Sequence, residues 1–232
     1  MKIAIISSSG GSAFNAFYNI SKNFWPENQY LIITDRPCGI EQVAADFHLP
    51  QIRFEEKDNN IFSQKTNDWL IKQGNVDCCF LFFSRLITFP LFSSFPCINF
   101  HESLLPSFKG FKALFQAISS GVKFFGATAH LVDADIDHGP IIAQACSPII
   151  SSANIDNINQ ASFIHKVCLE LIITEALMEK YLIFSENKII WLKTPTSGIQ
   201  FNPDLKNKEL KKIIHQLIIK NNVSEFFSSE IL

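Results

Sequence analysis

The sequence has little excess charge and lacks long apolar runs. Its 20 Lys and Arg and 22 Asp and Glu residues leave a formal net charge of −2, with both signs interspersed along the chain. Proteins that bind nucleic acid carry a basic stripe that neutralises phosphates, so this balance argues against a nucleic-acid partner. No stretch reaches the roughly 18 consecutive apolar residues that a membrane span requires, so we expect no membrane partner.

Several motifs are also missing. The six cysteines form no Cys-x-x-Cys pair, and most lie in apolar runs, which is typical of buried free thiols. We therefore expect a reducing, cytoplasmic location. The apolar start, Met1–Ile6, is shorter than the hydrophobic region of a signal peptide. There is no His-Glu-x-x-His motif, no Gly-x-Gly-x-x-Gly motif and no internal repeat, and we expect no metal.

Apolar runs of strand length alternate with segments of helical periodicity. The expected strands are 2–7, 29–34, 76–83, 97–100, 126–132, 140–146 and 188–192. The expected helices are 12–22, 40–47, 62–73, 110–120, 157–184 and 209–219. This alternation predicts an α/β fold with a doubly wound, mostly parallel sheet. We expect a catalytic domain over residues 1–193 and a C-terminal tail over 194–232 with an amphipathic helix, in the same domain or as an appendage.

Polar residues that can carry chemistry stand beside two of the expected strands. Asn99 and His101 are two positions apart, so on a strand both side chains point to the same face. Asp137 follows a later apolar run. An amide, an imidazole and a carboxylate can together stabilise an oxyanion and move a proton. We therefore interpret these three residues as an active site.

Other polar clusters have simpler explanations. Residues 133–137 imitate the start of a calcium-binding loop, but the glycine comes one position late and Gln144 stands where a glutamate is needed. His138 is interpreted as a solvated loop residue. His130 is as compatible with a structural role as with a chemical one.

Two further segments are candidates for ligand contact. Gly10, Gly11 and Ser12 follow the first expected strand, where backbone N–H groups and a helix N-terminus favour an anion. A serine cap in a tight turn explains the same residues equally well. Arg85 follows the most buried expected strand, and ligands of open α/β sheets bind beyond the carboxyl ends of strands.

Three ordered motifs resemble those of the folate-dependent formyltransferases. They are Asn99-Phe100-His101-Glu102-Ser103-Leu104-Leu105-Pro106, Gly126-Ala127-Thr128-Ala129-His130 and Asp137-His138-Gly139-Pro140. The resemblance is strongest to the members that formylate phosphoribosylglycinamide (GAR) in purine synthesis, and it extends from Met1 to about residue 184. It implies a Rossmann-like sheet with helices on both faces and a C-terminal helical appendage.

The resemblance also implies a role for each matching residue. The catalytic residues would be Asn99, His101 and Asp137. The folate-binding residues would be Arg85, Leu86, Ile87, Leu131, Val132, Ala134, Asp135 and Ile136. The residues that bind the phosphate of the acceptor would be Gly10, Gly11 and Ser12. The co-substrate would be 10-formyltetrahydrofolate, the acceptor a phosphorylated small-molecule amine, and the protein a monomer or homodimer.

Three positions depart from the pattern of the GAR enzymes. Ala13 stands where they have Asn, and Glu102 stands where they have Pro after the catalytic His. Their acidic residue on the long helix has no match in register, although Glu170 is near. The formyl-transfer centre is therefore kept, while the acceptor side is kept only in part. Two alternatives stay open: another amine, such as a nucleotide-linked amino sugar, and a non-catalytic folate- or nucleotide-binding module.

Overall fold

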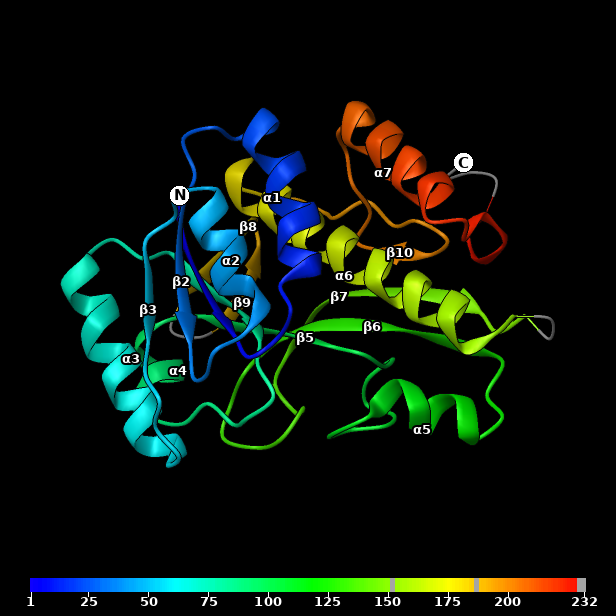
Figure 1. The fold of residues 1–232 in the computed structure, drawn as a ribbon. Helices are drawn as coiled ribbons and strands as arrows, with labels where there is room; N and C mark the ends of the chain where they lie inside the picture. Colours follow the sequence, from blue (N-terminus) through cyan, green and yellow to red (C-terminus); the bar gives the residue numbers. More distant parts are fainter. Residues whose placement is uncertain (151–152, 186–187, 229–232) are drawn as a thin grey trace. The chain divides into compact units, whose positions relative to one another are not determined.

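The computed structural model describes residues 1–150, 153–185 and 188–228, which form two compact units (Figure 1). The first unit comprises residues 1–100 and 131–140, with Lys188. The second comprises residues 101–130 and 141–185, and continues from residue 189.

The first unit is built on parallel strands. In spatial order these are β5 (Cys97–His101), β4 (Cys78–Phe82), β1 (Lys2–Ser7), β2 (Gln29–Thr34) and β3 (Gln51–Arg53). Its helices are α1 (Ser12–Phe24), α2 (Gly39–Asp46), α3 (Asn59–Gln73) and α4 (Leu91–Ser94). The register places Ile5 of β1 between Ile32 of β2 and Phe80 of β4. β1 has a strand on each side and helices on both faces of the sheet, so residues 3–7 are buried. This burial explains why the sequence of β1 is a nearly continuous apolar run.

Helices cover both faces of these strands. On one face, Ala4 of β1 shares an apolar core with Phe62 of α3 and Leu91 of α4. On the other face, the ring of Phe17 of α1 packs against the ring of Phe80 of β4, with centroids 6.2 Å apart. The strand alternation therefore supplies two apolar layers, and the predicted doubly wound arrangement with helices on both faces is confirmed.

The second unit contains antiparallel strands and one long helix. The strands are β6 (Phe124–Leu131), β7 (Ile141–Pro148) and the two-residue β10 (Phe201–Asn202), in the order β10-β7-β6. Strands β8 (Leu182–Ser185) and β9 (Lys188–Trp191) form a separate two-stranded sheet. The helices are α5 (Ala113–Ser119), α6 (Ile155–Met178), α7 (Lys208–Lys220) and a 3-10 turn at Ser224–Phe226. Helix α6 packs against β7, β8 and α7, and every residue from Val167 to Ala176 is buried.

The structure corrects one predicted helix and adds short elements. The helix expected over 157–184 ends at Met178, because Lys180 adopts a left-handed φ of 54° and Tyr181 N donates to Ala176 O at 2.8 Å. The apolar residues that follow form β8. Strands β3 and β10 and helix α4 were not predicted, because elements of two to four residues have no measurable periodicity. The division at residue 193 stays a prediction.

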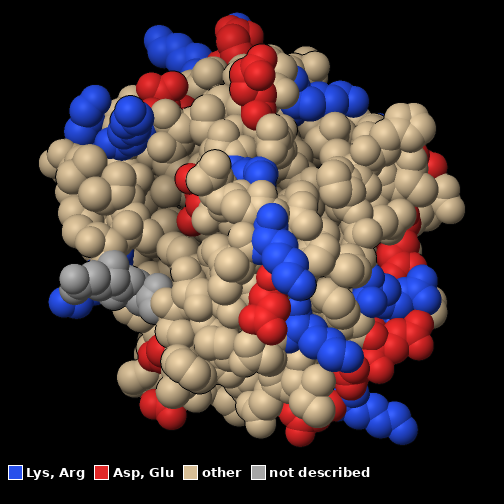
Figure 2. Space-filling view, turned by 90° about the vertical axis from the view of Figure 1, so that its left-hand side faces the viewer, with Lys and Arg blue, Asp and Glu red and all other residues tan. Residues whose placement is uncertain are grey.

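Charged residues of both signs are interspersed on the face shown in Figure 2, with broad uncharged areas between them. Arg53, for example, pairs with Glu41 at 2.6 Å and with Glu55 at 2.9 Å. Among the described residues, no helix is long and apolar enough to cross a membrane.

Candidate functional site

The first unit brings Asn99 and Asp137 together. Asn99 lies on β5 and Asp137 on the loop 131–140, and both are half-buried. Asn99 Nδ2 donates a hydrogen bond to Asp137 Oδ1 at 3.3 Å. Asp137 has a left-handed φ of 48°, a conformation that a non-glycine residue adopts only where its surroundings impose it. Two residues predicted as catalytic are therefore neighbours, although 38 positions separate them in sequence.

The loop 131–140 is closed at its neck. Leu131 N donates to Pro140 O at 2.9 Å, and Val132 N donates to Cys97 O of β5 at 2.8 Å. Gly139 fits only as glycine, because a Cβ atom there would lie 1.9 Å from Leu131 O. These contacts close the neck of the loop and fix it to the first residue of β5, and so restrain where Asp137 lies.

A second set of contacts organises the tip of this loop. Asp133 Oδ1 accepts a hydrogen bond from Asp135 N at 3.0 Å, and Asp133 Oδ2 lies 3.2 Å from His138 Nδ1. The side chain of His138 is 62% exposed, which agrees with its interpretation as a solvated loop residue. Of the predicted folate-binding residues here, Leu131 is buried and Val132 half-buried, and residues 134–136 are exposed.

The side chain of Arg85 is committed to contacts within the protein. Its guanidinium donates to Asn59 Oδ1 at 3.0 Å, to Lys57 O at 2.7 Å and to Glu56 O, and it pairs with Asp35 at 3.3 Å. The charge of Arg85 is therefore used within the protein.

Asp35, the acid in this network, is stabilised in its ionised form. Burial raises the pKa of Asp35, but hydrogen bonds and charges from Arg36 and Arg85 outweigh it, so the pKa falls below its ordinary value. The Asp35 carboxylate therefore anchors Arg85 at the carboxyl ends of the parallel strands.

The glycine-rich turn before α1 packs closely against the start of α2. Gly11 has a left-handed φ of 77°, and a Cβ atom there would lie 2.7 Å from the Cα of Ile40. Gly10 and Ser12 are exposed, and a Cβ atom on Gly10 would meet nothing within 4 Å. Close packing explains Gly11. The exposed residues 10 and 12 leave the predicted anion site open to a ligand.

The third predicted catalytic residue, His101, lies two positions after Asn99 on β5. Its side chain is buried in the second unit, and its Nε2 lies 2.8 Å from Phe108 O.

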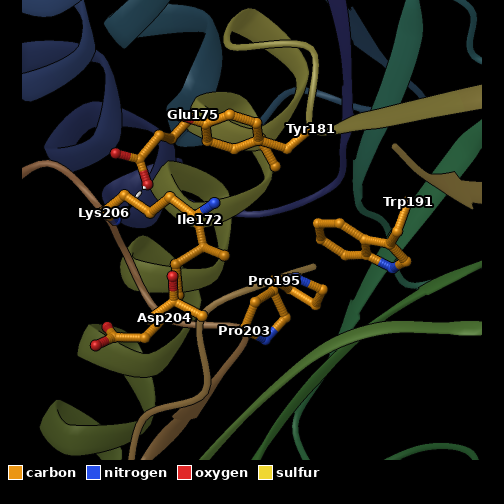
Figure 3. A pocket seen from close by; sticks show the side chains of 10 residues that line it. Ile172, Glu175, Tyr181, Trp191, Pro195, Pro203, Asp204 and Lys206 are labelled. Carbon is orange, nitrogen blue, oxygen red and sulfur yellow. Dashed lines mark hydrogen bonds between the residues drawn. The ribbon is translucent and has the colours of Figure 1, made fainter. Parts of the chain in front are cut away.

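The second unit contains a small cavity (Figure 3). None of the predicted site residues lines it. Every residue that lines it falls between Ile172 and Lys206. Glu175 accepts hydrogen bonds from Lys206 N and Asn207 N at 2.8 and 2.7 Å, and the Lys206 ammonium lies 3.8 Å from the ring centroid of Tyr181. Burial raises the pKa of Glu175, although the two backbone donors oppose this. The contacts tie the end of α6 to the start of α7.

Helix α6 also carries two buried titratable groups that the sequence prediction did not assign. Burial raises the pKa of Glu170 well above its ordinary value, and neither carboxylate oxygen has a hydrogen-bond partner in the described chain. Burial, together with the charge of Lys166, lowers the pKa of His165 to about 3. Within the described ranges, no group of three His, Cys, Asp or Glu side chains is arranged to hold a metal, and all six cysteines are free.

Comparison with known proteins identifies the family. The sequence profile of the formyl transferase family matches residues 1–171. The chain is 34% identical over 173 residues to phosphoribosylglycinamide formyltransferase of Bacillus subtilis (strain 168), covering 72% of this chain and 88% of that protein. It is 30% identical over 167 residues to formyltetrahydrofolate deformylase of Synechocystis, covering 69% of this chain and 58% of that protein.

A solved structure supports the same assignment. Glycinamide ribonucleotide transformylase 1 from Symbiobacterium toebii superimposes with a TM-score of 0.74 at 25% identity, covering 83% of this chain and 94% of that one. This likeness confirms the predicted Rossmann-like α/β fold. The chain belongs to the formyl transferase family, whose formyl donor is 10-formyltetrahydrofolate, as its motifs predicted.

Proposed function

We propose that this protein transfers the formyl group of 10-formyltetrahydrofolate to the primary amine of GAR. The observation that carries this proposal is the 3.3 Å contact between Asn99 and Asp137 in a chain of the formyl transferase family. The similarity to the GAR enzyme of Bacillus subtilis supports GAR as the acceptor. Gly10, Gly11 and Ser12 would bind the acceptor's phosphate through backbone N–H groups at the start of α1.

The proposed reaction passes through a tetrahedral intermediate. The amine nitrogen attacks the formyl carbon, and the formyl oxygen becomes an oxyanion. Asn99 Nδ2 and protonated His101 donate hydrogen bonds to this oxygen and stabilise its charge. Asp137 holds a water that takes the amine proton and passes it to the leaving nitrogen of the folate. The bond between the formyl carbon and that nitrogen then breaks, which yields the formylated amine and tetrahydrofolate.

Two segments of the first unit would hold the folate. The backbone of residues 85–87 would receive the pterin ring, since the Arg85 side chain is occupied by its own contacts. Residues 131–136 would close over it. Residues 85–87 follow β4, at the carboxyl end of a parallel strand, and this position supports the first part of the assignment.

The test is to mix the full chain with 10-formyltetrahydrofolate and GAR and to follow tetrahydrofolate release by absorbance. Loss of one oxyanion donor typically lowers turnover about 10²–10³-fold, so Asn99→Ala and His101→Ala should each fall at least that far. Asp137→Asn should be similarly harmful. His215→Ala on α7 is the matched control. Near-normal turnover in any of the three site variants would remove that residue from the mechanism.

A second candidate is hydrolysis of the formyl donor, with water in place of the amine. The similarity to the Synechocystis deformylase favours it, and so do Ala13 and Glu102 at positions where the GAR pattern is broken. Tetrahydrofolate and formate produced without any amine would identify this reaction. Folate binding without turnover would instead direct the search to other amines, beginning with nucleotide-linked amino sugars. From the sequence we also propose a cytoplasmic monomer or homodimer.

A further inference from the structure

In the second unit, one backbone carbonyl determines where His101 carries its proton. His101 is 7% exposed, and its Nε2 lies 2.8 Å from Phe108 O. A carbonyl oxygen only accepts hydrogen bonds, so Nε2 must be the donor and must be protonated. In the neutral ring, Nδ1 is then the nitrogen without a proton. Nδ1 is therefore the ring nitrogen that can accept a hydrogen bond.

The carbonyl of Phe108 is held in an unusual backbone conformation. Phe108 has a left-handed φ of 53°, which is costly for a bulky side chain and persists only where neighbouring contacts impose it. The hydroxyl of Ser103, which is 1% exposed, donates to Ser107 O at 2.6 Å and lies 3.2 Å from Phe108 O. Ser103 therefore closes the turn that aims the Phe108 carbonyl at His101.

A second buried hydroxyl holds the start of the same turn. Thr128 on β6 is fully buried, and its Oγ1 donates to Ser103 O at 2.7 Å. The same oxygen accepts from Leu105 N at 3.1 Å and from Gln144 Nε2 at 3.0 Å. Gln144 Nε2 also contacts Leu105 O at 3.0 Å. The donor and both acceptor positions of the Thr128 hydroxyl are thus used. Two of these bonds hold the segment 103–105 directly, and the third joins Thr128 to Gln144, which itself donates to Leu105 O.

We propose that Ser103, Thr128 and Gln144 are positioning residues that hold the Phe108 carbonyl, so that His101 keeps its proton on Nε2 and reacts through Nδ1. The proposal deepens the proposed function, because it rests on a catalytic role for His101. Its chemical consequence is specific. Neutral His101 can only accept a hydrogen bond at Nδ1, so only the imidazolium can donate from that atom to the oxyanion of the tetrahedral intermediate.

Thr128→Val tests this network, because it keeps the shape of the side chain and removes only the hydroxyl. We expect kcat to fall by about 10²-fold, the loss that a misplaced catalytic group can cause, with little change in the KM for the amine. Thr128→Ser keeps the hydroxyl and should restore kcat. Thr174→Val is the matched control, since Thr174 is buried on α6 and its hydroxyl has no hydrogen-bond partner among the described residues.

The decisive measurement is the 15N NMR spectrum of the full chain labelled at histidine, with the signal of His101 assigned by its loss in His101→Gln. Wild type, Thr128→Ser and Thr174→Val should show the neutral ring protonated on Nε2. Thr128→Val should show a mixture of tautomers. If Thr128→Val does not fold, Ser103→Ala, which removes the hydroxyl beside Phe108 O, replaces it.

The outcomes separate this proposal from the proposed function. A wild-type ring protonated on Nδ1, or a variant that keeps both the wild-type spectrum and the wild-type kcat, would overturn the positioning role. The expected tautomers in a protein that formylates no amine would support the positioning role and refute the proposed function alone.

Discussion

Buried His165 makes the stability of this protein depend on pH over a defined range. Its ring lies on α6 and packs against the rings of Phe125 and Phe227, with centroids 5.3 and 5.6 Å away. Its Nε2 lies 2.8 Å from Ser147 Oγ. Burial first, and the charge of Lys166 second, lower its pKa from 6.5 to about 3.

The sign follows from where the proton binds. The unfolded chain takes up the proton near 6.5 and the folded protein only near 3, so acid favours the unfolded state. The stability contribution of neutral His165 is complete above pH 6.5 and is lost as the pH falls toward 3. At about 1.4 kcal/mol per pH unit the whole loss is about 5 kcal/mol. Many domains have a total stability of about 5–15 kcal/mol, so this one group can decide acid unfolding.

The assay is urea unfolding of wild type and His165→Gln between pH 4.5 and 7.5. Gln cannot titrate and can still hydrogen-bond to Ser147 Oγ. The smaller side chain costs some packing at every pH, but the stability of wild type relative to the variant should fall by about 3 kcal/mol between pH 7.5 and 4.5. His215→Gln on α7 is the control. A difference between wild type and His165→Gln that stays constant over this range would refute the reasoning.

Two further predictions concern a buried acid and a tight loop. Because burial raises the pKa of Glu170 above 4.5, its stability contribution is present below that pH and is lost as the pH rises. In urea unfolding, the free energy of unfolding of Glu170→Gln should therefore rise relative to that of wild type by up to about 1.4 kcal/mol per pH unit above pH 4.5. A difference between the two proteins that does not change with pH would contradict this. Gly139→Ala would place a Cβ atom 1.9 Å from Leu131 O, so the loop that carries Asp137 must move. We expect kcat to fall by about 10²-fold with an unchanged circular dichroism spectrum; normal turnover would show that the loop tolerates the shift.

The strands of the first unit show how far apolar pattern alone can predict a fold. β1 and β2 have the bounds expected from the sequence, because each is a short apolar run that ends at polar turn residues. The hydrophobic run after Asn157 could not be divided in the same way. β8 has only four residues, and a short apolar run fits a helix as well as a strand. Only the left-handed backbone of Lys180 in the structure shows that α6 ends before β8 begins.

The candidate catalytic residues could also be found from the sequence, without knowledge of the residues that surround them in the fold. The spacing of Asn99 and His101 depends only on the two-residue period of a strand. Both lie on β5, which extends one residue beyond the expected strand 97–100. The side-chain network of Arg85 could not be predicted, because its partners Asn59 and Lys57 come from a different part of the chain.

The sequence by itself determined the family, the alternation of strands and helices, and the chemical types of the proposed catalytic groups, because each depends on residues close together in the chain. Only the tertiary structure decided that Asn99 meets Asp137 and that His165 is buried. These facts depend on hydrogen bonds and solvent exclusion between distant segments. Such contacts form only when the chain packs, and no local pattern encodes them.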